Sequence, residues 1–563
     1  MSHKELTAFY LLIILFLAPL WVFSRMPLQD GPSHLAGANI IKEYNKADAS
    51  IFRKFYSISS EPVPNWTGHA VLALLLSWMS PEMAEKLLLS GYVILLPIAF
   101  RYLLGGINPE GTILAFLAFP FIYNFLFHMG FYNFVWSVAL FFLVIGYWIR
   151  KRENLSAWNI LVFSGLVLVL YFSHIFTFTL SGVSLALIEV WLAVFFVQTH
   201  TANDNSKFRN FLLAIGPRAV VGALAYLPAI VLAALFMVQR ETVPIPGSSN
   251  FFVALNMLGS LYTLVSFEWN EIWVTRVIAA CLGLLGVCHL FYKIKSRTIE
   301  KFDGFFLIFL AFVLLYFIAP NTLLVSRNGM SGGGFIKDRI GMFPFLALII
   351  WMGVQRPIRR ISRGVVWVVV GCSLTLVVMQ MSKYDELSDY MQEYESALEL
   401  IAPNTSVLPI SFFKHGSDQK IEPFSLKVDP FRHVPEIISA KKNVVALSHY
   451  EGNMGYFPTK FQQNLNPFMV LGKLPWNLEK LDLLKNLKES SIGYPDYVVL
   501  WMAPRKDSEL WNRFPVLQQV TEHYDLIFRS VPKGLALLYR KKEAAIPSQV
   551  MTQHHNLSGQ LFK

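Results

Sequence analysis

The sequence is poor in charged residues and in cysteine. Charged residues make up 15% of its 563 residues, whereas soluble domains carry about 25%, and hydrophobic residues reach 54%. The cysteines Cys281, Cys288 and Cys372 all lie inside apolar runs, which argues against a disulfide framework and a cysteine-based zinc site. Gly332–Gly334 lacks the spacing of a phosphate-binding P-loop. A soluble, disulfide-stapled, collagen-like or disordered chain is therefore excluded.

Long apolar runs dominate the sequence instead, and a bilayer-spanning helix needs about 17 to 25 such residues. We predict a polytopic α-helical membrane protein with eleven full spans, at Leu6–Ser24, Lys86–Leu104, Gly111–His128, Phe131–Ile149, Trp158–Ile175, Phe178–Val197, Phe211–Val238, Trp273–Tyr292, Phe305–Pro320, Ile340–Val354 and Gly364–Met381. Two weaker segments, Trp66–Ser80 and Phe251–Phe267, are predicted to be partial; thirteen full spans is the alternative. No small-residue cleavage site follows Leu6–Ser24, so we interpret it as a retained signal anchor.

The distribution of lysine and arginine indicates the orientation. The chain has 48 Lys and Arg against 37 Asp and Glu, a formal charge of +11. The basic clusters lie at the ends of apolar runs, which is typical of cytoplasmic loops rather than of a nucleic-acid surface. Those predicted to be cytoplasmic are Arg150–Arg152, Lys207–Arg209, Lys293–Lys301 and Arg356–Arg363. The N-terminus is then cytoplasmic, whereas a first loop over residues 25–65 and everything after Met381 are external.

The hydropathy falls after Met381, and the pattern becomes that of an α/β domain. Helices are predicted over Tyr384–Ile401 and between Asp507 and Thr521. Short β-branched runs predict strands at Val407–Ile410, Val444–Leu447, Tyr497–Trp501, Leu526–Arg529 and Leu535–Tyr539. We thus divide the chain into a transmembrane domain (1–381), an extracytoplasmic α/β domain (382–542) and a disordered tail (543–563).

The first external loop holds the most informative short stretch, Gln29–Leu35 (QDGPSHL). If Pro32 lies in the first turn of a helix, Asp30 falls at its cap and His34 within that turn. A carboxylate and an imidazole so placed can act as a general base, a metal-ligand pair or a polar lock. The alternative is that Asp30 merely caps the helix.

Further ionisable residues are predicted to reach the same external face. Such groups are costly at membrane depth and usually mark a site or pathway; the candidates for a shared cavity are Glu61, His69, His128, His174 and Asp338. A single histidine in an apolar segment is, however, also typical of a hydrogen-bonded packing residue. Lys337 and Arg339 could bind a phosphate, Arg339 through its planar fork. The alternative is that both anchor a helix end at the lipid headgroups.

The order of these features resembles the GT-C superfamily of integral membrane glycosyltransferases, which use polyprenyl-phosphate-linked sugars. The resemblance covers a signal anchor, an acidic first loop at Gln29–Leu35, about a dozen hydrophobic helices and an external C-terminal α/β domain. It implies that Asp30 is the catalytic base or a metal-site acid, and it leaves open whether a divalent metal takes part. A second acidic residue is frequent in a later external loop of that family, and Glu110 would match it only in the thirteen-span topology.

We therefore expect a glycosyltransferase of a bacterial inner (plasma) membrane that transfers a hexose or pentose on the extracytoplasmic face. Asp30 would serve as base, assisted by His34, and Lys337 and Arg339 would bind the donor phosphate. The expected partners are the bilayer, the polyprenyl-phosphate-sugar donor and an unspecified glycan, lipid or protein acceptor, with no nucleic acid. Two alternatives remain: a lipid or glycolipid transporter or flippase, and a noncatalytic polysaccharide-assembly protein. The sequence shows no internal repeat of the kind common in transporters.

Overall fold

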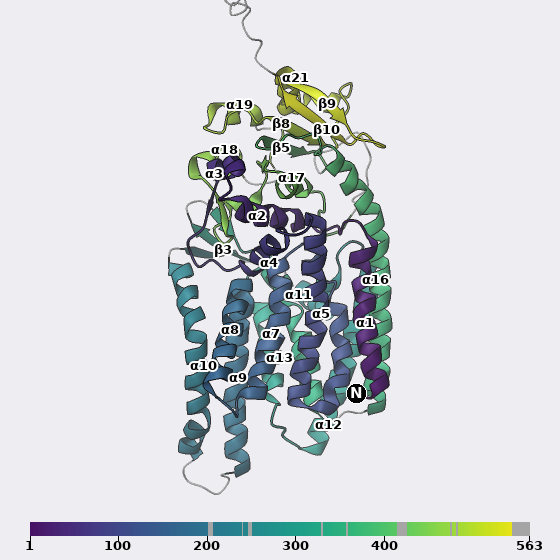
Figure 1. Cartoon of the computed structure of the whole chain (residues 1–563). Helices are drawn as coiled ribbons and strands as arrows, with labels where there is room; N and C mark the ends of the chain where they lie inside the picture. The colour runs from purple at the N-terminus through teal and green to yellow at the C-terminus, as the bar shows by residue number, and fades with distance from the viewer. Residues whose placement is uncertain are drawn as a thin grey trace, which may run out of the picture.

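The computed structural model consists of a bundle of long helices and an outer layer of short helices and strands at one end of it (Figure 1). It describes residues 1–200, 207–238, 240–245, 250–327, 330–355, 359–413, 425–472, 476–479 and 482–542. The predicted tail at 543–563, and part of the basic cluster at 356–363, lie outside these ranges.

Each of the eleven predicted spans coincides with an apolar helix or 3-10 helix of the bundle. In the described part of the chain, seven helices are long and apolar enough to cross a membrane: α1 (His3–Val22), α5 (Pro81–Ile107), α7 (Tyr132–Lys151), α9 (Ile175–His200), α10 (Lys207–Val238), α12 (Glu271–Ser296) and α16 (Arg359–Ser396). The shorter apolar elements among them are the 3-10 helix η2 (Pro109–Phe121) and the helices α8 (Ala157–Ser173), α13 (Gly304–Ile318) and α15 (Phe343–Val354). The prediction of a polytopic α-helical membrane protein is confirmed.

The two weaker apolar segments form only short helices. Helix α4 (Thr67–Leu75) and helix α11 (Phe251–Gly259) have nine residues each. At 1.5 Å per residue each spans roughly 14 Å, less than half of the ~30 Å hydrocarbon core. Neither can cross a membrane, in agreement with their prediction as partial segments.

The basic clusters gather at the end of the bundle that holds the N-terminus (Figure 1). Glu153, just after α7, pairs with Arg218 at 2.6 Å and with Lys301 at 3.9 Å. Arg363 in α16 pairs with Glu5 in α1 at 3.1 Å. The outer layer lies at the opposite end, which is the arrangement that the distribution of basic residues requires.

The outer layer contains a five-stranded mixed sheet in the order β6-β5-β8-β10-β9. Its strands are β5 (Ser406–Ser411), β6 (Val445–Ala446), β8 (Tyr497–Trp501), β9 (Tyr524–Arg529) and β10 (Ala536–Lys541). Strand β5 runs parallel to β6 and β8, whereas β10 is antiparallel to β8 and β9. Its helices include α17 (Ile437–Lys441), α18 (Pro467–Leu471), α19 (Leu483–Glu489), α20 (Glu509–Asn512) and α21 (Pro515–His523). Helix α16 reaches this layer without interruption, so residue 381 falls inside a helix.

The first loop is built into the outer layer. Its elements are α2 (Gly31–Glu43), η1 (Ala47–Ala49), α3 (Ser50–Phe55) and β1 (Tyr56–Ile58). Strand β1 pairs with β7 (Thr459–Phe461), with Tyr56 opposite Phe461. The Asn39 side chain of α2 donates a hydrogen bond of 2.8 Å to the carbonyl of Ser439 in α17. Helix α2 therefore lies between the bundle and the C-terminal residues (Figure 1).

The remaining described elements are short and connect these two parts. They are α6 (Phe125–His128), η3 (Tyr262–Leu264), α14 (Ile336–Ile340), η4 (Val434–Glu436), η5 (Tyr450–Asn453), η6 (Gln463–Leu465) and an antiparallel sheet of β2 (Glu241–Ile245), β3 (Thr322–Arg327) and β4 (Met330–Gly332).

Candidate functional site

Asp30 lies at the N-cap position of α2, and Pro32 lies in the first turn of that helix. Its side chain is buried, with 5% of the residue exposed, and it makes no capping hydrogen bond. Instead its carboxylate accepts a hydrogen bond of 2.9 Å from the hydroxyl of Tyr450 and one of 3.0 Å from Nε2 of Gln29. The carboxylate thus faces the C-terminal residues rather than the backbone of its own helix.

A histidine and a glutamate lie next to this carboxylate. Nε2 of His433 lies 3.7 Å from Oδ1 of Asp30, and its Nδ1 lies 2.7 Å from Oε1 of Glu436. Burial raises the pKa of Glu436 to about 8 and lowers that of His433 to about 4. At neutral pH Glu436 is therefore protonated and donates to Nδ1, so the neutral ring carries its proton on Nε2, toward Asp30. His433 therefore lies between Glu436 and Asp30.

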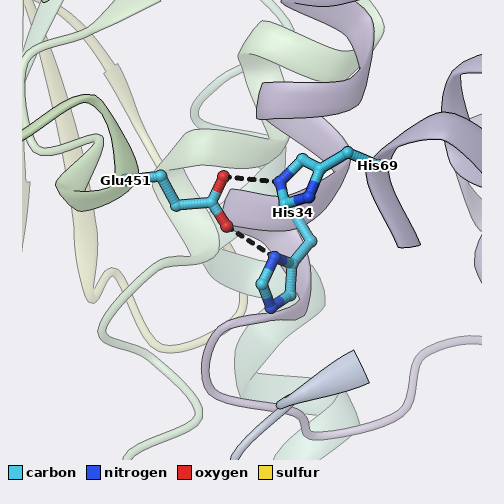
Figure 2. Close-up of side chains that lie close together, drawn as sticks. All are labelled: His34, His69 and Glu451. Atoms are coloured by element: carbon cyan, nitrogen blue, oxygen red, sulfur yellow. Dashed lines mark hydrogen bonds and ion pairs between the residues drawn. The ribbon is translucent and has the colours of Figure 1, made fainter. Parts of the chain in front are cut away.

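Beside Asp30, two histidines converge on a second carboxylate (Figure 2). His34 comes from α2, His69 from α4 and Glu451 from η5, and all three are buried. Nδ1 of His34 lies 2.5 Å from Oε1 of Glu451, and Nε2 of His69 lies 2.8 Å from Oε2. Burial acts to raise the pKa of Glu451, yet His69 and His34 hold it well below its ordinary value. Glu451 is therefore a carboxylate at neutral pH.

These three side chains could hold a metal ion. One ligand atom from each lies within 4.8 Å of the others, and the described residues contain no second group of this kind. Asp30 is not a member, because its two oxygens accept from Tyr450 and Gln29. The structure thus separates the candidate metal ligands from the candidate base.

A cavity of about 500 Å³ is lined mainly by apolar side chains, several of them from α11 and η3. Lys337, Asp338 and Lys427 line it as well. Nζ of Lys427 lies 3.5 Å from Oδ1 of Asp338, and 3.6 Å and 4.2 Å from the ring centroids of Phe125 and Tyr262. The cavity therefore combines apolar walls with ammonium groups.

Arg339 lies on the helix that carries two residues of the cavity wall, Lys337 and Asp338. It follows Lys337 and Asp338 on α14, and its guanidinium lies over the rings of Phe131 and Phe134, at 5.2 Å and 5.7 Å from their centroids. Nη1 donates to the carbonyl of Gly334 at 2.9 Å, whereas Nε is buried without a hydrogen-bond partner. No carboxylate of the described chain forms an ion pair with it, although Asp30 lies within electrostatic range. A cation so placed favours binding of an anion.

The other predicted cavity residues have different surroundings. Glu61 pairs with Arg240 at 2.7 Å and with Lys460 at 3.3 Å. His128 is fully buried between Ser266 and Tyr384, hydrogen-bonded to both, as in the packing alternative.

His174 lies near Arg339 rather than near Asp30. Its Nδ1 accepts a hydrogen bond of 3.2 Å from the amide of Phe176. Its ring packs edge-on against Phe134, which also contacts Arg339. The structure thus brings His174 and Arg339 to one place, and His34 and His69 to another.

Glu110, considered as a second acid, lies at the far end of the bundle. It is in the first turn of η2, and Thr112 of the same element lies 3.5 Å from the terminal amine of Met1. Asp30 lies at the other end, beneath the outer layer (Figure 1). Glu110 therefore cannot act together with Asp30.

Sequence reasoning missed the contribution of the C-terminal residues to the site. Those residues are Lys427, His433, Glu436, Tyr450 and Glu451. They lie about 400 positions after Asp30, and only the packing of α2 against the outer layer brings them close. The signal that could have marked them is the dense pairing of His with Glu in HVPE (433–436) and HYE (449–451).

Comparisons with known proteins add a structural similarity. No protein-family model matches the sequence, and no curated protein matches it. Among solved structures, the chain is similar to the crystal structure of ArnT from Cupriavidus metallidurans in the apo state, with a TM-score of 0.49 and 9% sequence identity, covering 95% of this chain and 98% of that one.

Proposed function

We propose that this chain is a membrane glycosyltransferase of the GT-C type. It moves a sugar from a polyprenyl-phosphate-linked donor to an acceptor hydroxyl at the end of the bundle that carries the outer layer. The observation that carries the proposal is the buried Asp30 carboxylate within electrostatic range of Arg339, together with an apolar cavity lined by Lys337 and Lys427. A lipid-linked sugar phosphate needs these three elements: a base, an apolar binding site and positive charge.

The transfer step follows from the chemistry of these groups. Asp30 takes the proton of the acceptor hydroxyl while the acceptor oxygen bonds to the anomeric carbon of the sugar. The bond between that carbon and the phosphate oxygen breaks, and its electron pair leaves with the polyprenyl phosphate. The developing negative charge is stabilised by Arg339 and by the two lysines. Tyr450, which donates to Asp30, keeps the carboxylate oriented toward the acceptor.

The surroundings of the cavity suit a donor that arrives from the bilayer. Helix α11 contributes Ala254, Met257 and Leu258 to the cavity wall. The same helix leaves Phe251 and Phe252 exposed, as expected of a surface that faces lipid tails. The first isoprene units can therefore enter beside α11 with the rest of the chain in the membrane.

Neutralising the cations of the cavity is expected to weaken donor binding. A hydrogen bond to a charged group contributes about 1.5 to 3 kcal/mol, so Lys427→Gln and Arg339→Gln should each raise the donor KM about 10- to 100-fold. Steady-state kinetics with varied donor concentration measure this change. Lys54→Gln, which alters an exposed lysine on α3, is the matched control. An unchanged donor KM in both variants would show that the phosphate binds elsewhere.

A vesicle assay separates transfer from transport. Proteoliposomes containing the purified chain receive a polyprenyl-phosphate-linked sugar and a mixture of hydroxyl acceptors, and the products are analysed by mass spectrometry. Our proposal predicts a new glycosidic bond together with polyprenyl phosphate. Movement of the intact donor across the membrane without any new bond would support the transporter alternative instead.

A further inference from the structure

We infer that His34, His69 and Glu451 bind a divalent transition-metal ion, with Zn²⁺ as the ion that the donor set prefers. The three ligands come from α2, α4 and η5, so the ion would tie the first loop and the bundle to the outer layer (Figure 2). This inference does not depend on sugar transfer, since Asp30 and the cations of the cavity are not ligands.

The hydrogen bonding of His69 selects the atom that faces the carboxylate. Its Nδ1 lies 3.0 Å from the backbone carbonyl of Asn65. A carbonyl only accepts, so Nδ1 carries a proton, which leaves Nε2 as the atom that can bind a metal ion. Nε2 lies 2.8 Å from Oε2 of Glu451, and an ion that displaces the proton between these two atoms would be bound by both. Donation of the second ring nitrogen to a backbone carbonyl is the usual support of a metal-bound histidine.

The other two ligands have unsatisfied buried atoms that a metal would satisfy. Nδ1 of His34 and Oε1 of Glu451 are buried and make no hydrogen bond of ordinary geometry, although they form an ion pair. Buried polar atoms are paired in the great majority of cases. Nδ1 of His34 and Oε1 of Glu451 face each other at 2.5 Å, so one ion between them would serve both atoms.

The packing around the cluster leaves room for the carboxylate and fixes the first histidine. A Cβ on Gly37, one turn after His34 in α2, would lie 2.6 Å from Oε2 of Glu451 and 3.1 Å from the ring of His69. The ring of His34 packs against that of Tyr132, with centroids 5.0 Å apart. Glycine at position 37 thus allows Glu451 to approach α2, and the aromatic contact limits the movement of the ligand.

Two imidazoles and one carboxylate form the donor set of many open zinc sites. Zinc–ligand bonds of about 2.1 Å in tetrahedral geometry place ligand atoms roughly 3.4 Å apart. The present distances of 2.5 Å and 2.8 Å need to widen by less than ~1 Å to reach that value. Because Tyr450 immediately precedes Glu451 and donates to Asp30, the bound ion would also position Tyr450.

The test measures metal binding on the full-length chain in detergent, purified with a tag that lacks histidine. After dialysis against EDTA, Zn²⁺ is added back, and bound metal is measured by mass spectrometry and by titration calorimetry. We expect one Zn²⁺ per chain, with the affinity lowered about 100-fold or more in His69→Gln and Glu451→Gln. His289→Gln, which alters a buried histidine of α12, should bind as the wild type does. Co²⁺ in place of Zn²⁺ should give visible d–d absorption that His69→Gln loses.

Two results would overturn the inference. One is a wild-type chain that retains no Zn²⁺ above the level of His69→Gln. The other, decisive if the variants do not fold, is a wild-type melting temperature that Zn²⁺ fails to raise relative to EDTA. Zinc binding without sugar transfer would leave this inference intact and count against the proposed function. Sugar transfer without zinc binding would overturn this inference and leave the proposed function intact.

Discussion

Replacement of Asp30 by asparagine is expected to lower the rate of sugar transfer about 10²- to 10⁴-fold, the range that a positioned general base contributes. Asparagine has nearly the same shape and can still accept from the hydroxyl of Tyr450, the contact that holds Asp30 in place. It cannot take up the acceptor proton. The loss should therefore appear in kcat, with the donor KM little changed, because the cations of the cavity are intact.

The control for this variant is a second carboxylate on the same helix. Glu43 lies in the last turn of α2, where it pairs with Lys42 at 2.9 Å and Lys46 at 3.0 Å. Glu43→Gln should transfer sugar at the wild-type rate, and both variants should elute from size exclusion as the wild type does. Equal transfer by Asp30→Asn and the wild type would remove Asp30 from the reaction.

Replacement of Arg25 by methionine is expected to destabilise the fold by about 3 to 5 kcal/mol, the cost of leaving buried charges without their partner. Arg25 follows α1 and has 6% of its surface exposed. Its guanidinium lies 2.8 Å from Glu82, 2.9 Å from Glu395 and 3.9 Å from Glu85. Without it these carboxylates repel one another where α1, α5 and α16 meet. Lys441 contacts Glu82 and Glu395 at 3.1 Å each and offsets part of the loss.

Unfolding in detergent, followed by tryptophan fluorescence against temperature, measures this effect. Arg25→Lys keeps the charge but not the planar fork, so it should fall between the methionine variant and the wild type. Arg53→Met in α3 is the control, because Arg53 bonds to backbone carbonyls rather than to buried carboxylates. If Arg25→Met unfolds at the temperature of the wild type, Arg25 does not stabilise the fold by pairing with these carboxylates.

The bundle could be predicted because a membrane imposes both length and composition on a helix. Each predicted span coincides with a helix or 3-10 helix, and the strand predicted at Tyr497–Trp501 is β8. The boundary at residue 381 marks a change of hydropathy, not the end of an element. Helix α16 continues to Ser396, because residues such as Glu386 and Glu393 alter polarity without breaking a helix.

The site was less predictable, since its parts are far apart in the chain. A short motif with a proline after an acid was enough to single out Asp30 and His34, both on one helix. The partner Glu451 comes from a different region, and no local pattern relates it to α2. Glu61 was predicted for the same face, and in the structure it forms an ion pair with Arg240. Two residues at the same end of a bundle need not contact each other.

The most direct test of the proposed function is the release of polyprenyl phosphate by the purified chain. The wild type and Asp30→Asn are incubated with an extract of polyprenyl-phosphate-linked sugars and hydroxyl acceptors, and polyprenyl phosphate is quantified by mass spectrometry. We predict acceptor-dependent release by the wild type and a rate about 10²- to 10⁴-fold lower with Asp30→Asn. Absence of release by the wild type, or equal release by both chains, would contradict a glycosyltransferase that uses Asp30 as its base.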